Sequence, residues 1–102
     1  MAEAVAKKVF SQFNVSNSGK LQGMEVKHFI AFEYLMDDMR IKAEDIEDSK
    51  VELFLNELGC AGKDGCSEED FVKVLLQSGK SVEDMQKLEA EVQKYFKNLS
   101  PA

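Results

Sequence analysis

Side-chain oxygens recur at alternate positions near the start of the chain. They belong to Asn14, Ser16 and Ser18, and a carboxylate follows at Glu25. Calcium binds oxygen ligands of this kind in twelve-residue loops, with side-chain ligands at positions 1, 3, 5 and 12. Gly19 stands at position 6, where the backbone turns sharply and favours glycine. The spacing therefore predicts a cation-binding type of loop.

The charge of this loop is low for a calcium site. Glu25 is its only carboxylate, and Lys20 at position 7 offers a backbone carbonyl but adds a positive charge. Calcium affinity in such loops depends on the number of charged ligands and on rigidity. We therefore expect a weak or vestigial calcium loop, and no other cofactor. Its ligand residues are Asn14, Ser16, Ser18, Lys20 and Glu25.

Helices are expected on both sides of this loop. Residues 2–13 carry an apolar stripe at helical spacing and predict the entering helix. Residues 24–39 predict the exiting helix, and their large apolar side chains exceed what one core-facing side needs. Either a further helix or a partner must cover this excess. The predicted partner-binding residues, two of them from a later helix, are Phe29, Phe32, Leu35, Met36, Met39, Phe71 and Leu75.

A second unit of the same kind is expected between residues 49 and 78. Ser49 and Glu52 have the spacing of a capping box and predict the start of its first helix. The loop at 59–70 is glycine-rich and lacks the oxygens of a metal site, so we expect no cation there. Leu21 and Cys66 stand at position 8 of the two loops, which predicts a short β pairing between them.

Two capping serines and a glycine divide the rest of the chain. Ser67 predicts the start of a helix over residues 67–78, and Gly79 predicts its end. Ser81 predicts the cap of another helix. This last helix carries a heptad-like stripe, and we expect it to pack on the domain across the wide face of residues 24–39. The stripe is formed by Met85, Leu88, Val92, Tyr95 and Leu99.

From about residue 5 to residue 78 the chain resembles the EF-hand family of calmodulin and myosin light chains. The resemblance implies an all-α fold of two paired EF-hands, at about 5–37 and 49–78, with a short β pairing between the loops. A fifth helix over 79–102 packs on the same domain. The implied function is a calcium-independent or weakly calcium-binding adaptor that binds a target helix through an apolar groove. A calcium sensor that uses the first loop alone is an alternative.

Two further resemblances give other functions. The segments KVELF at 50–54 and SEEDF at 67–71 are similar to parts of the p25-alpha family of tubulin-associated proteins. That family implies a microtubule-associated, cytoskeletal protein. The segment DSKVEL at 48–53 is similar to the site of acyl carrier proteins, which attach phosphopantetheine to the serine, here Ser49. Lys50 stands where that family has leucine.

Composition limits the remaining classes. A chain of 102 residues with 44% hydrophobic and 31% charged residues is typical of one folded domain. The net charge is −6, and residues 23–70 hold fourteen acids against five bases. Such a surface does not suit nucleic acid, and it favours a basic amphipathic helix, such as one from a motor or cytoskeletal protein. No apolar run could span a membrane and no secretory signal is seen, so the cytosol is the expected compartment.

Catalytic and redox groups are few. His28 is the only histidine, no nucleophile is paired with a base, and no phosphate-binding glycine loop occurs, so we expect no enzyme activity. Cys60 and Cys66 are the only cysteines, and we expect both to be reduced structural thiols.

Overall fold

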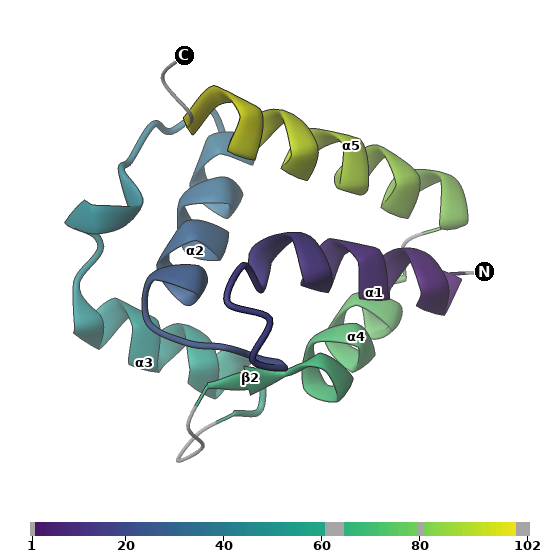
Figure 1. Cartoon of the computed structure of the whole chain (residues 1–102), viewed down its shortest axis with the longest axis horizontal. Coiled ribbons are helices and arrows are strands. Elements are labelled where there is room, and N and C mark those ends of the chain that lie inside the picture. Colours follow the sequence, from purple (N-terminus) through teal and green to yellow (C-terminus); the bar gives the residue numbers. More distant parts are fainter. Residues whose placement is uncertain (1, 61–64, 80, 100–102) are drawn as a thin grey trace.

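A computed structural model describes residues 2–60, 65–79 and 81–99 of the chain. These residues form five α-helices, a short 3-10 helix and two short strands (Figure 1). The mainly helical architecture confirms the all-α prediction. In chain order the elements are α1 (Ala2–Phe13), β1 (Lys20–Leu21), α2 (Met24–Met36), η1 (Ala43–Asp45), α3 (Asp48–Glu57), β2 (Cys66–Ser67), α4 (Glu68–Gln77) and α5 (Val82–Leu99).

The two strands join the two loops. They pair antiparallel, with Leu21 opposite Cys66 and Lys20 opposite Ser67, which is the pairing that the loop positions predicted. Gly65, just before β2, has a φ of +107°, and a Cβ atom there would lie 2.5 Å from the carbonyl oxygen of Leu21. Only glycine therefore allows the two loops to approach this closely without a shift.

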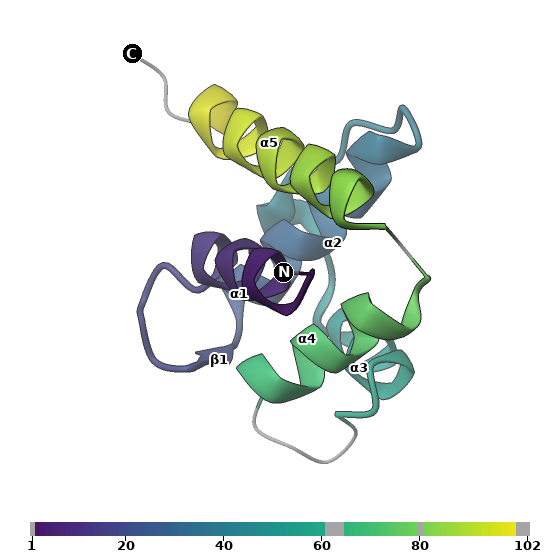
Figure 2. The ribbon, with the colours of Figure 1, turned by 90° about the vertical axis from the view of Figure 1, so that its right-hand side faces the viewer.

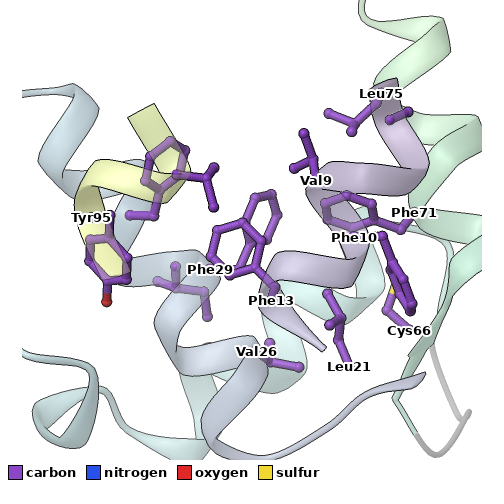
Figure 3. Packing of buried hydrophobic residues seen from close by; sticks show 14 of the residues in the cluster. Val9, Phe10, Phe13, Leu21, Val26, Phe29, Cys66, Phe71, Leu75 and Tyr95 are labelled. Carbon is purple, nitrogen blue, oxygen red and sulfur yellow. The ribbon is translucent and has the colours of Figure 1, made fainter. Parts of the chain in front are cut away.

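Aromatic side chains form the centre of the core (Figure 3). The ring of Phe13 on α1 lies 5.0 Å from that of Phe29 on α2 and 5.3 Å from that of Phe96 on α5. Phe71 on α4 lies 5.6 Å from Phe10 and 5.1 Å from Phe29. All four pairs are edge-to-face, the arrangement that the ring quadrupoles favour. This cluster links four of the five helices.

Helix α1 lies between α5 on one side and α4 on the other (Figures 1 and 2). The buried side of α5 is formed by Met85, Val92 and Tyr95 from the predicted stripe. The backbone N–H of Asp84 donates to the Ser81 hydroxyl at 3.1 Å, which is the predicted cap. The fifth helix therefore covers α1 and reaches α2.

The start of α4 follows the prediction, and the start of α3 does not. The Asp70 N–H donates to the Ser67 hydroxyl at 3.2 Å, so Ser67 caps α4. Helix α3 already begins at Asp48, after an N-cap at Glu47 that makes no side-chain cap bond. The predicted capping box at Ser49 is therefore wrong, because Ser49 lies inside the first turn and not before it.

Helix α2 ends three residues earlier than its apolar pattern predicted. Asp38 takes a φ of +62°, and its N–H donates to the Leu35 carbonyl at 3.0 Å. The Met39 N–H donates to the Tyr34 carbonyl at 2.9 Å. This pair of bonds is a Schellman motif, which ends the helix and turns the chain away. Met39 therefore lies beyond α2 and not on its surface.

Candidate functional site

The carboxylate of Glu25 points back into the first loop. One oxygen, Oε2, accepts hydrogen bonds from the Ser16 backbone N–H at 2.9 Å and from the Ser16 hydroxyl at 2.8 Å. The other, Oε1, accepts from the Gln22 N–H at 3.2 Å. Glu25 is only 7% exposed and lies in the first turn of α2. Three donors from the loop therefore satisfy this buried carboxyl group and fix the start of α2.

A second set of hydrogen bonds closes the other half of the loop. The Asn14 amide is oriented so that its oxygen accepts from the Gly19 N–H at 2.9 Å and its nitrogen donates to the Lys20 carbonyl at 3.1 Å. The Ser18 hydroxyl donates to the same Lys20 carbonyl at 2.9 Å. The backbone carbonyl at position 7 thus already has two donors, where a calcium loop would present it to the ion.

The predicted ligand residues lie close together, but they form hydrogen bonds with one another. Their oxygens already accept hydrogen bonds from hydroxyl and amide groups of the loop. Calcium would have to break these bonds, and it would gain only one carboxylate ligand, Glu25, in return. The residues present therefore do not fit a calcium ion well. Within the described part of the chain, no group of three or more His, Cys, Asp or Glu residues is placed to hold a metal.

The second loop is described only in part. Its central ligand positions, Ala61 and Lys63, lie outside the described residues. At its ends, the Cys60 thiol lies 3.6 Å from a carboxylate oxygen of Asp70. Cys60 and Cys66 are both fully buried, and their role as reduced structural thiols stays a prediction.

Four of the predicted partner-binding residues are buried in the core. Phe29, Phe32 and Phe71 are 5%, 0% and 1% exposed, and Leu75 is also buried. These four side chains therefore do not lie on the surface of this structure, and a role for them in partner binding stays a prediction. Helix α5 covers the extra face of α2, since the ring of Tyr95 lies 5.9 Å from that of Phe32. The sequence allowed either a further helix or a partner protein to cover this face, and in the structure the fifth helix does so.

The other predicted residues lie at or beside a groove between α2, the segment 38–44 and α5. Leu35 and Met36 line it, and Met39 is exposed next to it in the chain. We call it the α2–α5 groove, and its volume is about 930 Å³. Its apolar lining is formed by Met24, Leu35, Met36, Ile41, Tyr95 and Leu99. Sequence reasoning missed Ile41, Tyr95 and Leu99 as groove residues, because they come together only when α5 docks.

Charge is unevenly distributed around this groove. Its own lining is balanced, with three acids (Asp38, Glu44, Glu91) and three bases (Arg40, Lys42, Lys94). The adjoining segment 37–57, from the end of α2 through α3, holds eight acids and three bases, all exposed. Eight minus three leaves five of the six net negative charges of the whole chain in this segment. Most of the net negative charge therefore lies in the segment that begins at the groove and continues through α3.

His28 and Tyr95 connect the two helical walls of the groove. The Nδ1 atom of His28 on α2 lies 2.9 Å from the hydroxyl oxygen of Tyr95 on α5, a hydrogen bond. Burial lowers the pKa of His28 and raises the pKa of Tyr95, so both groups are neutral at pH 7. This neutral pair holds α5 against α2 and sets the width of the groove.

Comparison with known proteins gives no relative from which a function could be transferred. No protein-family model, curated protein or solved structure matches the chain. Across residues 2–60, 65–79 and 81–99, no helix has the length and apolar character needed to cross a membrane. The first loop and the α2–α5 groove are therefore the features on which a functional proposal rests.

Proposed function

We propose that this protein is a calcium-independent adaptor of the EF-hand type, which binds a helix of a partner protein in the α2–α5 groove. The EF-hand assignment is supported by the two loops. Leu21 and Cys66, at position 8 of each twelve-residue loop, pair directly in the small sheet. Gly19, at position 6 of the first loop, has a φ of +88°, as the sharp turn of such a loop requires.

Calcium independence is supported by the hydrogen bonds of the first loop. In a calcium sensor, the ion connects the start of the loop to the carboxylate at position 12. Here the Ser16 N–H and hydroxyl make that connection to Glu25 directly. Since Glu25 belongs to the first turn of α2, these bonds hold the helix in place without an ion.

The α2–α5 groove is the observation that carries the binding proposal. Met24, Met36 and Leu99 line it and are 47%, 42% and 45% exposed. Methionine is flexible and polarisable, so it adapts to different apolar side chains. A helix that binds in a groove inserts apolar side chains at i, i+3, i+4 and i+7. A cavity of about 930 Å³ has room for several such side chains.

Charge complementarity favours a basic amphipathic helix as the partner. The segment 37–57, part of which lines the groove, carries eight acids against three bases, all of them exposed. A helix with its apolar side in the groove could place basic residues over this segment. The opposite charges would speed association and fix the orientation of the helix, and the apolar contacts would supply most of the affinity.

Groove binding can be tested with matched double variants. Met24→Gln with Met36→Gln is expected to weaken binding of a synthetic leucine–lysine amphipathic helix of about 18 residues by on the order of tenfold or more, because it buries two amides in place of apolar side chains. The control is Leu53→Gln with Leu76→Gln, which changes two exposed apolar side chains outside the groove. Isothermal titration calorimetry gives both affinities. Equal affinities for the two double variants would rule out the groove as the binding site.

A further inference from the structure

The surface beneath α5 is apolar and aromatic. Phe13 on α1 and Phe32 on α2 are 1% and 0% exposed, and α5 covers both. The ring of Phe13 lies 5.3 Å from that of Phe96, and the ring of Phe32 lies 5.9 Å from that of Tyr95. If α5 moved away, a continuous aromatic surface across α1 and α2 would meet water.

The other four helices have a core of their own. Phe71 on α4 packs on Phe10 of α1 at 5.6 Å and on Phe29 of α2 at 5.1 Å, and Phe54 on α3 lies 5.3 Å from Phe29. The pairing of β1 with β2 joins the two loops. None of these contacts involves α5. The unit formed by α1 to α4 would therefore keep these contacts while α5 was detached.

Helix α5 itself has the features of a ligand helix. It buries one stripe, formed by Met85, Val92 and Tyr95, and exposes polar residues such as Gln93 and Lys97 on its other side. Because α1 to α4 contact one another without α5, this helix can leave its site and return without rearranging them.

We propose that the α1–α2 surface beneath α5 is a second helix-binding surface, and that α5 is its exchangeable occupant. The partner is an amphipathic helix with the same stripe as α5, in which aliphatic residues are followed by an adjacent pair of aromatics. The seated α5 shows which side chains this surface accepts. A partner binds only the fraction of molecules in which α5 is open, so its apparent affinity is the intrinsic affinity multiplied by that fraction. This surface lies beneath α5, whereas the α2–α5 groove uses α5 as one wall, so a molecule with α5 detached would offer the first and lose the second. The proposal does not rest on the function proposed for the groove.

Hydrogen exchange on the full-length wild-type chain tests whether α5 opens by itself. The amides of α5 are expected to exchange through a partial opening, at least about tenfold faster than amides in the centres of α1 and α4 that exchange only on global unfolding. Equal protection of α5, α1 and α4 would overturn the proposal, because α5 would then detach only when the whole protein unfolds.

A variant of α5 tests the exchange of occupants. Phe96→Ala removes a half-buried ring that contacts Phe13, and Gln93→Ala is the control on the exposed side of the same helix. The probe is a synthetic peptide of residues 82–99. Relative to wild type, Phe96→Ala is expected to bind this peptide about tenfold more tightly, and its α5 amides to exchange faster by the same factor, since both report the open fraction. Gln93→Ala should match wild type in both measurements.

Three results would contradict this proposal. The first is no saturable binding of the peptide to Phe96→Ala, and the second is equal binding to all three chains. The third is a wild-type dimer that exchanges α5 between two chains, seen by light scattering, because it would place a second copy of the chain on this surface in place of a partner. Failure of the leucine–lysine helix to bind the groove would leave this test unaffected.

Discussion

Replacing Asn14, Ser16 and Ser18 together by aspartate is expected to create a calcium site with a dissociation constant of about 10⁻⁷ to 10⁻⁵ M, the range of sensor loops. The three aspartates would stand at positions 1, 3 and 5, with Gly19 and Glu25 already in place at positions 6 and 12. Without calcium the variant should be less stable than wild type, because three new carboxylates lie near the buried Glu25. Calorimetric titration and thermal unfolding with and without calcium measure both effects.

A second triple variant controls for charge alone. Ser11→Asp, Val15→Asp and Asn17→Asp add the same three charges at exposed positions that are not ligand positions. This control should bind calcium no better than wild type. Equal calcium affinity in the two triple variants, or none in either, would show that the first loop does not have EF-hand geometry.

Phe32→Ala is expected to destabilise the fold by about 3 to 5 kcal/mol, the usual loss for a fully buried phenylalanine. Total stability of a small domain is about 5 to 15 kcal/mol, so this variant should be close to unfolding at room temperature. Phe32 is 0% exposed and lies between α2 and α5. The control is Met36→Ala, which truncates a side chain in the next turn that is 42% exposed and should cost under about 1 kcal/mol.

Urea unfolding followed by circular dichroism gives both free energies. A loss below about 1 kcal/mol for Phe32→Ala would mean that the ring is not part of the core, since surface substitutions fall in that range. In that case Phe32 would again be a candidate for a surface residue that contacts a partner. The two variants together separate the core side of α2 from its groove side.

Local features of the fold could be predicted because each depends on a few residues close in the sequence. The first loop follows from the spacing of Asn14, Gly19 and Glu25, since turn geometry depends on residue type at fixed positions. The pairing of Leu21 with Cys66 follows from their equal places in the two loops. The failure at Ser49 has the same local origin, because a capping sequence shifts by one residue at little cost.

Features that depend on distant contacts could not be predicted. The large number of apolar side chains in residues 24–39 was visible in the sequence. Their pattern does not indicate that α5 covers Phe32. The α2–α5 groove also requires the turn at Asp38, whose positive φ is unusual for a residue other than glycine. Met24 and Leu99 lie 75 residues apart and meet only in the folded chain. Burial of a given apolar residue is a property of the tertiary fold and not of the helical pattern alone.

The first loop and the groove are connected through α2. Glu25 fixes the first turn of this helix to the loop, while Met36 in its last turn lines the groove. In the proposed function, a loop that is closed by its own hydrogen bonds would hold the groove wall in one position, whether calcium is present or not. This is the main difference from a sensor, in which the ion would move the helix and open the groove.

The most direct test of this account is the calorimetric titration of the wild-type protein with the leucine–lysine helix, once in excess chelator and once in excess calcium. Saturable binding with the same affinity is expected in both solutions, because Ser16 and Gln22 hold Glu25 without an ion. Binding that occurs only with calcium, or that calcium strengthens by about tenfold or more, would contradict it.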